Sequence, residues 1–239
     1  MKEQREIPKS VPAPDLFPDE AIELVTELCF LTRNEASREN MVGSYGEVLI
    51  FGTSHPTSHE QIADAFAGEL CDDLYLAEIV YITGGATKPG IVESEAILTC
   101  ISARFDVSRQ SRSDYSKIDF RLDRDSRDTL GNVECAIKLG LGSGDTGIIF
   151  IAKSGHCGRC KLTLSRLLPR KKVHAWGYDA ILSDGIPPVN RDTWFQNPKV
   201  RDLVWGEFLR IELYGEGGNI AYPDKIRQNV ERVRVLTRT

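Results

Sequence analysis

Side chains that could hold an anionic or nucleotide-like small molecule are concentrated in four short segments of the chain. These segments are residues 52–58, 83–95, 123–132 and 153–159. The last segment contains His156 and Arg159, and an imidazole beside a guanidinium suits the binding of a phosphate or a carboxylate. We expect Arg159 to pair with such an anionic group. His156 is the best candidate for an acid or a base, because the ordinary pKa of histidine lies near neutrality.

Glycines and two acids mark the second of these segments. Gly84 and Gly85 would let a ligand approach the backbone closely, since neither has a side chain. Glu93 and Glu95 follow at the expected start of a helix, where acids either compensate the helix dipole or accept hydrogen bonds from a ligand. We favour a functional role more strongly for Glu95 than for Glu93, and we predict that Glu95 takes part in any catalysis.

Three carboxylates, Asp123, Asp125 and Asp128, lie within six residues in the third segment. They could hold a divalent cation or ligand hydroxyls, whereas the same run of charge is also typical of a solvated helix entry. Neither the glycine spacing of a dinucleotide-binding loop nor that of a P-loop occurs in the sequence. Nicotinamide cofactors and P-loop chemistry are therefore disfavoured.

Pairs of cysteine and histidine raise the question of zinc or redox chemistry. Cys157 and Cys160 form a C-x-x-C motif at an expected helix start, where the dipole would favour a thiolate. The sequence has no second pair of this kind to complete a zinc site, and the motif follows a late strand rather than the first strand of a thioredoxin-like unit. His55 and His59 could share a metal, but roles within the loop fit them better. We therefore predict no metal site.

Alternating strands and helices must position these segments. Apolar runs predict strands at residues 48–52, 79–82, 118–122, 148–152 and 173–176. Helices are expected at residues 18–32, 91–104, 126–141 and 156–168 and from Ser58 onward, with Ser58 and Ser126 as caps. This order predicts an α/β, Rossmann-like sandwich with a parallel sheet of about five strands and helices on both faces. Its ligand should lie at the carboxyl ends of the strands.

The C-terminal part of the chain departs from this alternation. Pro187-Pro188 and Asn197-Pro198 interrupt it, and a helix over residues 200–214 and a charged final helix follow. We expect a Rossmann-like domain over residues 1–182, with its core at about residues 47–178. We expect residues 183–239 to form a helical extension packed on the same domain, and the helix at residues 18–32 to pack on the sheet.

Composition limits the classes of partner. The sequence has 30 basic and 35 acidic residues and a net charge of −5, which gives no global electrostatic reason to bind nucleic acid. It contains neither the apolar stretch of a signal peptide nor a run long enough to span a membrane. Cysteines in apolar segments suit a reducing compartment. We expect a cytoplasmic protein with a small-molecule ligand and no membrane partner, and we predict no oligomeric state.

The motifs of the four segments together resemble the YdcF/SanA-type domain family, a bacterial α/β family, over about residues 48–176. The matching residues are Gly52, Thr83-Gly84-Gly85, Ser94-Glu95-Ala96, Asp123, Ser126, Thr129, Asn132, Ser154, His156 and Arg159. Residues 205–211 resemble a further segment of the YdcF branch more loosely. The chain departs from the family pattern at Thr83, Asp123 and Gly131, where the family usually has Ser, Glu and Glu, and in its first loop.

The resemblance implies a Rossmann-like fold whose motif residues line one ligand site. The implied ligand-binding residues are Gly52, Thr53, Gly84, Gly85, Glu95, Asp123, Ser126, Thr129, Asn132, Ser154, His156 and Arg159. For the YdcF branch it also implies S-adenosylmethionine or a related nucleotide as the ligand.

Three functions stay open at this point. The first is binding of a nucleotide-like metabolite such as S-adenosylmethionine, with or without group transfer. The second is metal-assisted hydrolysis or transfer on a phosphorylated or otherwise activated metabolite, with a metal held by Asp123, Asp125 or Asp128. The third is a non-catalytic interaction protein that uses the aromatic segment at residues 194–214 as its interface.

Overall fold

A parallel sheet forms the centre of the computed structural model, which describes residues 11–15, 17–31, 45–53, 55–70, 78–86, 90–107, 117–182 and 185–237. Five strands in these residues pair in the order β3-β2-β1-β4-β5, and every pair is parallel. The strands are β1 (Tyr45–Ile50), β2 (Ile79–Ile82), β3 (Asp119–Leu122), β4 (Gly147–Lys153) and β5 (Val173–Tyr178). The predicted α/β class with a five-stranded parallel sheet is confirmed.

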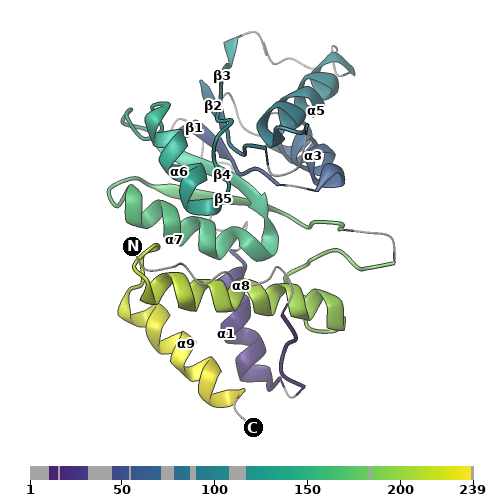
Figure 1. The fold of residues 1–239 in the computed structure, drawn as a ribbon, viewed down its shortest axis with the longest axis vertical. Helices are drawn as coiled ribbons and strands as arrows, with labels where there is room; N and C mark the ends of the chain where they lie inside the picture. The colour runs from purple at the N-terminus through teal and green to yellow at the C-terminus, as the bar shows by residue number, and fades with distance from the viewer. Residues whose placement is uncertain are drawn as a thin grey trace.

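Helices cover both faces of this sheet, as predicted (Figure 1). On one face pack α3 (Pro56–Ala63) and α5 (Glu93–Val107). On the other face pack α6 (Thr129–Lys138) and α7 (Cys157–Leu167). Two shorter helical stretches adjoin them, a π-helical continuation of α3 at Asp64–Leu70 and a 3-10 turn before α7 at Ser154–His156.

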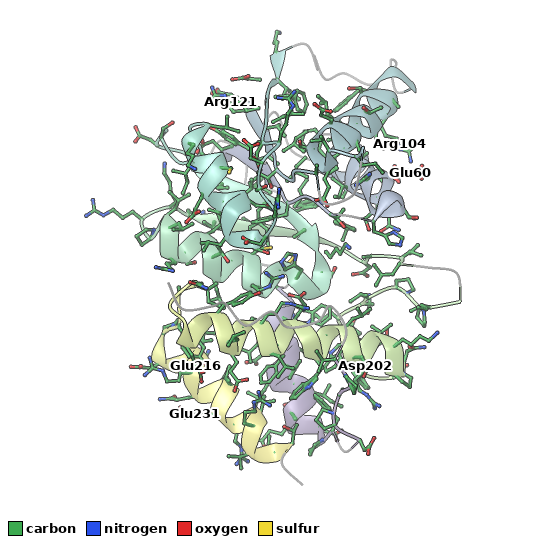
Figure 2. All side chains as sticks on the ribbon, in the orientation of Figure 1. Glu60, Arg104, Arg121, Asp202, Glu216 and Glu231 are labelled. Carbon is green, nitrogen blue, oxygen red and sulfur yellow. The ribbon has the colours of Figure 1, made fainter. Side chains whose placement is uncertain are left out.

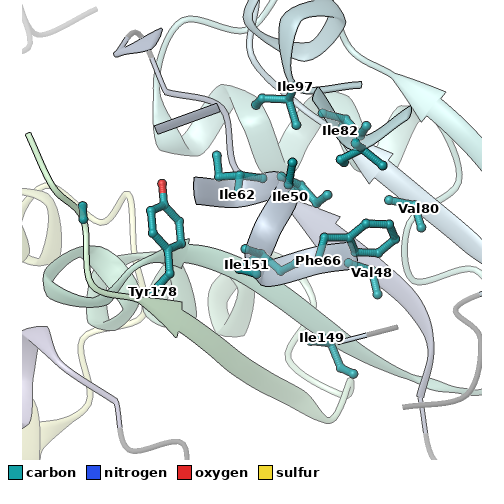
Figure 3. Packing of buried hydrophobic residues seen from close by; sticks show 14 residues of the cluster. Val48, Ile50, Ile62, Phe66, Val80, Ile82, Ile97, Ile149, Ile151 and Tyr178 are labelled. Carbon is teal, nitrogen blue, oxygen red and sulfur yellow. The ribbon is translucent and has the colours of Figure 1, made fainter. Parts of the chain in front are cut away.

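Alternate residues of β1 supply the two halves of the core. Val48 and Ile50 belong to the half under α3 and α5, where they join Ile62 and Ile97 (Figure 3). Leu49 belongs to the half under α6 and α7. Because a strand turns successive side chains to opposite faces, a strand covered by helices on both sides must be apolar throughout. This is why the central strands appear in the sequence as unbroken apolar runs.

Three further helices form a second hydrophobic cluster beside α7 (Figure 1). They are α1 (Asp19–Cys29), α8 (Pro198–Glu216) and α9 (Asp224–Leu236), which we call the helical unit. The expectation that the helix at residues 18–32 packs on the sheet is wrong, because its buried stripe, including Val25 and Leu28, packs with α8 and α9. Neither these helices nor any other in the described ranges is long and apolar enough to span a membrane.

The contact between the helical unit and α7 is close at the level of the backbone. A Cβ on Gly158 of α7 would lie 1.8 Å from the carbonyl oxygen of Leu28 on α1, so no side chain fits there. A Cβ on Gly155, just before α7, would lie 3.2 Å from Val189 and 3.4 Å from Phe30. The glycines around the start of α7 therefore let the helical unit lie directly against the carboxyl edge of β4.

Two helices begin differently from the prediction. Asp128 caps α6 by accepting a backbone N–H of the first turn at 2.8 Å, so the prediction of Ser126 as its cap is wrong. The helix α3 begins at Pro56 without a side-chain cap, and the prediction of Ser58 is wrong there too. Gln61, the expected partner of Ser58, makes two hydrogen bonds to the backbone after β5 instead. The side chain of Gln61 is thus used in a contact across the fold, and that of Ser126 in hydrogen bonds to Asp123 and Asn132.

Candidate functional site

The predicted site residues lie at the carboxyl edge of the sheet, next to its topological switch point. The chain leaves β1 toward α3 on one face and leaves β4, the neighbouring strand, toward α7 on the other face. In open α/β sheets, ligands bind outside the carboxyl ends of the strands at such a point. Here the rings of Phe51, which follows β1, and His156, which follows β4, lie 6.2 Å apart. The residue just before the first predicted segment therefore lies close to the fourth segment.

Arg159 of α7 is held by two partners. Its Nε donates to Oε2 of Glu207 on α8 at 2.8 Å, and its Nη1 donates to Oγ1 of Thr129 on α6 at 2.6 Å. Arg210, one turn along α8, donates from Nη1 to Oε1 of Glu207 at 2.9 Å. The side chains of Arg159 and Glu207 are only 11% and 21% exposed. The arginine predicted to bind an anion thus already has a carboxylate partner, which comes from the helical unit.

Sequence reasoning missed Glu207 and Arg210 as site residues. They lie on α8 at i, i+3 spacing, beside the buried Phe208 and Ile211. Charged residues are rarely buried unless they are paired, so their place within an apolar helical stripe was the available signal. Burial on its own raises the pKa of Glu207, but the charge of Arg159 above all lowers it to about 2. Glu207 is therefore an anion throughout the physiological pH range.

His156 is half-buried and uncharged at neutral pH. Burial lowers its pKa to about 3, and the positive charge of Arg159 acts in the same direction. Its Nε2 lies 3.1 Å from Oγ1 of Thr129, and its side chain makes no other hydrogen bond with the described residues. The pKa of His156 in the fold thus lies well below the ordinary value of histidine, on which the prediction of an acid or a base relied. His156 is consequently a poor general acid or base at neutral pH, although it remains well placed as a hydrogen-bonding group.

The loop after β3 is organised by the buried carboxylate of Asp123. Its Oδ1 accepts the backbone N–H of Asp125 at 2.9 Å, and its Oδ2 accepts that of Gly84 at 3.4 Å and the hydroxyl of Ser126. Ser126 Oγ also lies 2.6 Å from Oδ1 of Asn132. Burial raises the pKa of Asp123, but the hydrogen bonds lower it below the ordinary value overall. The structure thus brings Asp123, Ser126 and Asn132 together in one network.

The predicted glycines are required by the packing of the loops themselves. A Cβ on Gly52 would lie 2.3 Å from the carbonyl oxygen of Thr83, and a Cβ on Gly84 would lie 2.7 Å from Oε2 of Glu93. Gly84 also has a φ of +123°, which residues with side chains rarely adopt. A Cβ on Gly85 would lie 2.5 Å from a carbonyl oxygen of the loop after β3. Close approach of a ligand to these backbones stays a prediction.

The acids at the start of α5 have different surroundings. Glu93 is buried, with its carboxylate close to Gly84. Glu95 is exposed, and its Oε1 accepts from Nε of Arg124 at 2.7 Å in a pair whose Arg and Glu side chains are 58% and 52% exposed. Between the two acids, Ser94 is fully buried, and its Oγ has no hydrogen-bond partner in the part of the chain that the structure describes. Glu95 is not part of the buried cluster, and a catalytic role for it stays a prediction.

Thr53 and Ser154, which follow β1 and β4, complete the predicted set. The carbonyl oxygen of Thr53 lies 2.7 Å from Nε2 of His59 on α3, so this ring nitrogen forms a hydrogen bond with the loop after β1. Ser154 Oγ donates to Oδ1 of Asp179 at 2.6 Å, and Nδ2 of Asn190 donates to the other carboxylate oxygen at 2.6 Å. Sequence reasoning missed Asp179. The available signal was its position directly after β5, because polar residues after each parallel strand reach the same edge.

The C-x-x-C motif lies inside the core. Cys157 and Cys160 are fully buried, and Sγ of Cys157 lies 3.4 Å from the carbonyl oxygen of Lys153. Burial raises the pKa of Cys160 well above its ordinary value, which favours the unreactive thiol. Thiol–disulfide exchange therefore gains no support. Among the residues with described positions, no three side chains of His, Cys, Asp or Glu are grouped as a metal ion would require.

Comparison with known proteins leaves the function to be argued from the site itself. No family model matches the chain, and no curated protein matches it either. Membership of the YdcF/SanA-type family therefore stays a prediction, and so does S-adenosylmethionine as the ligand.

Proposed function

We propose that the chain is a cytoplasmic protein that binds a small molecule with an anionic group at the carboxyl edge of its sheet. S-adenosylmethionine is the leading candidate, and group transfer is the candidate reaction. The observation that carries the proposal is the hydroxyl of Ser94, which is fully buried without a hydrogen-bond partner among the described residues at the start of α5. Leaving a buried polar group unsatisfied costs about 1–3 kcal/mol, and a ligand at this edge would remove that cost.

The helix ends at the same edge favour an anionic group. The helices α5 and α7 both begin there, and α7 starts at Cys157 without a side-chain cap. Helix N-termini carry unpaired N–H groups and a partial positive charge, so they attract carboxylates and phosphates. Arg159 and His156 lie in the first turns at this end of α7. These features support an anion near α7.

The loop after β3 supports a second part of the ligand with hydroxyl or ammonium groups. The hydrogen bonds around Asp123 lower its pKa, so it is an anion and an acceptor at neutral pH. S-adenosylmethionine has both kinds of group, a carboxylate on one part and ribose hydroxyls and an ammonium on others. In the proposed mode, its carboxylate faces α7 and its donors face Asp123. His156 acts as a hydrogen-bonding group and not as the base of a transfer reaction.

The cysteines support the cytoplasmic part of the proposal. Cys29, Cys157 and Cys160 are buried, and neither they nor Cys100 and Cys135 form a disulfide within the part of the chain that the structure describes. Protein thiols persist in this form in reducing compartments.

A thermal-shift and calorimetric screen tests the proposal. Purified protein is titrated with S-adenosylmethionine, S-adenosylhomocysteine, nucleotides, sugar phosphates and divalent cations. A ligand that binds only the folded state at 100 times its Kd stabilises by about 2.7 kcal/mol, which raises the melting temperature. We expect Asp123→Asn to weaken binding more than tenfold and Ser94→Ala to weaken it several-fold. Ser143→Ala is the matched control, because Ser143 lies in the turn before β4, at the opposite end of the strand.

The outcomes separate the functions left open by the sequence. A ligand that binds both site variants as well as the wild type would refute the proposed site. Stabilisation by a divalent cation alone, lost in Asp123→Asn, would favour the metal-assisted hydrolase instead. No stabilisation by any compound in the screen would favour the non-catalytic interaction protein.

A further inference from the structure

A continuous chain of contacts links the helical unit to the predicted ligand edge. It starts at Glu207 on α8, whose Oε2 accepts a hydrogen bond from Nε of Arg159 at 2.8 Å. It continues from Nη1 of Arg159 to Oγ1 of Thr129 at 2.6 Å, and from there to Nε2 of His156 at 3.1 Å. Thr129 is the first residue of α6 and is buried, so its hydroxyl has few alternative partners.

The direction of the hydrogen bonds that Arg159 makes follows from the chemistry of the groups, and that of the bond between Thr129 and His156 depends on the histidine tautomer. A guanidinium only donates, so Oγ1 of Thr129 accepts from Arg159. The Thr129 hydroxyl keeps its own proton, so it can donate to the neighbouring ring nitrogen, Nε2 of His156, when that nitrogen carries a lone pair. A neutral imidazole carries one proton, so with Nε2 as the acceptor the proton lies on Nδ1.

We propose that Glu207 is a positioning residue for the ligand site: through Arg159 and Thr129 it holds His156 in the tautomer with its proton on Nδ1. His156 then offers a neutral N–H donor to an acceptor oxygen of the ligand. The ligand part of this inference rests on the proposed function, because that function places a ligand at this edge. The tautomer itself is a property of the protein alone.

Burial above all, together with charged groups on three elements, keeps His156 neutral. Arg159 on α7, Lys153 on β4 and Arg210 on α8 disfavour its protonation, and among the described residues only Glu207 favours it. With burial, the result is a pKa of about 3. The donor at Nδ1 is therefore present, unchanged, from pH 5 upward.

This state of His156 narrows the chemistry of the ligand. The ligand atom beside Nδ1 must be an acceptor such as a carboxylate or phosphate oxygen, because an N–H donor of the ligand would face another N–H. The same state also rules out proton abstraction from a substrate by Nε2, whose lone pair is engaged by Thr129. Any proton transfer in a reaction at this edge has to use another group.

Histidine NMR on the ligand-free protein tests the positioning role directly. Two-bond 1H–15N correlation spectra distinguish the two neutral tautomers and the imidazolium. The sequence has four histidines, and the His156 signals are those lost in His156→Asn. We expect the wild type to show the Nδ1–H tautomer of His156 from pH 5 to 8 without titration.

Variants of α8 separate positioning from general packing. Glu207→Ala should convert His156 to a mixture of tautomers, because Arg159 loses its anchor and Thr129 is no longer fixed. Glu207→Gln should restore the wild-type pattern, since its amide oxygen can still accept from Arg159. Glu212→Ala is the matched control, because Glu212 also lies on α8, pairs with Arg234 on α9 and has an 18% exposed side chain, close to that of Glu207. It should lower stability and leave the tautomer unchanged.

Several results would overturn the inference. One is a wild-type His156 that carries its proton on Nε2 or titrates between pH 5 and 8. Another is a folded Glu207→Ala protein with the wild-type tautomer. If Glu207→Ala fails to fold, Thr129→Val decides, since it removes only the hydroxyl: an unchanged tautomer in that variant refutes the chain of contacts.

Calorimetry with S-adenosylmethionine keeps the two proposals apart. If the tautomer behaves as expected and S-adenosylmethionine binds, Thr129→Val should weaken its binding five- to tenfold, and equal binding would refute the role of His156 toward the ligand. If the tautomer behaves as expected and neither S-adenosylmethionine nor any other compound of the screen binds, the proposed function fails while the positioning of His156 by Glu207 stands.

Discussion

Two Arg–Glu pairs near the carboxyl edge of the sheet have almost the same geometry and very different surroundings. Nε of Arg159 lies 2.8 Å from Glu207, and Nε of Arg124 lies 2.7 Å from Glu95. The first pair joins α7 to α8 with side chains that are 11% and 21% exposed. The second joins α5 to the loop after β3 with side chains that are 58% and 52% exposed. Distance alone does not distinguish them, but access of water does.

The difference in water access changes what each pair does. An exposed pair gains little over separate hydration of its partners, and its contribution to stability is about 0–1 kcal/mol. A buried pair need not add stability relative to apolar residues, but removing one partner leaves a charge in a poorly solvated place. The pair of Arg159 and Glu207 therefore fixes how α8 sits against α7, whereas the pair of Arg124 and Glu95 leaves both side chains able to move.

The largest expected effect is that of Glu207→Ala. It leaves the buried guanidinium of Arg159 without its carboxylate, and breaking a buried pair in this way costs about 3–5 kcal/mol. Urea unfolding followed by circular dichroism measures the loss of unfolding free energy. The triple variant Arg159→Met, Glu207→Leu, Arg210→Met should recover most of that loss, because it removes all three charges of the buried cluster. A loss below about 1 kcal/mol for Glu207→Ala would put this pair in the same class as the exposed one.

Acid pH tests the same cluster without a mutation. The pKa of Glu207 is lowered from 4.5 to about 2 in the folded protein, so its contribution is complete above pH 4.5 and is lost as the pH falls toward 2. A shift of this size corresponds to about 3 kcal/mol. His156 acts in the same direction, since its pKa falls from 6.5 to about 3: the unfolded chain takes up the proton first, and stability decreases as the pH falls below 6.5.

Urea midpoints measured from pH 8 down to pH 3.5 check this dependence. His156→Asn should remove the part of the decline that begins near pH 6.5 and leave the part below pH 4.5. A wild-type midpoint that stays constant between pH 6.5 and 4.5 would contradict the lowered pKa of His156.

A smaller effect is expected for Asp123→Asn in the loop after β3. The amide keeps one acceptor oxygen but loses the negative charge. That charge strengthens the hydrogen bonds donated by the N–H groups of Gly84 and Asp125 and by the hydroxyl of Ser126. Hydrogen bonds to a charged group contribute about 1.5–3 kcal/mol each, and most are kept in weaker form, so we expect a loss of about 1–3 kcal/mol. Asp125→Asn, a change on an exposed side chain of the same loop, is the control and should be nearly neutral. Equal losses for both would show that the loop responds to charge in general.

The strands were the part of the fold that the sequence predicted best. The bounds of β2 match the predicted residues 79–82, because an unbroken apolar run that ends at polar and glycine residues suits a strand buried on both faces. The position of α1 was not predictable in the same way. Its apolar stripe showed that one face is buried, but helical spacing does not say whether a sheet or other helices bury it.

The site was predictable only where its partners are close in the sequence. Asp123, Ser126 and Asn132, which the resemblance assigns to one ligand site, lie within ten residues and form one hydrogen-bonded network. Glu207 lies 48 residues from Arg159 and reaches it only because α8 packs beside α7. Glu95 attracted attention because it begins a helix after a strand, yet the buried acid of that helix start is Glu93. Local spacing placed the loops at the right edge without showing which side chains turn inward.

The smallest expected effect is that of Glu95→Ala, and it completes the comparison of the two pairs. Arg124, the partner, is itself exposed, so water replaces the lost carboxylate and no charge is left buried. We expect the free energy of unfolding to change by about 0–1 kcal/mol in urea titrations at low salt, and this change to shrink further in 0.5 M salt because exposed charges are screened. The cost of Glu207→Ala should depend much less on salt. A salt-independent loss above about 2 kcal/mol for Glu95→Ala would instead show that Glu95 belongs to a desolvated site, which would favour the functional role predicted for it from the sequence.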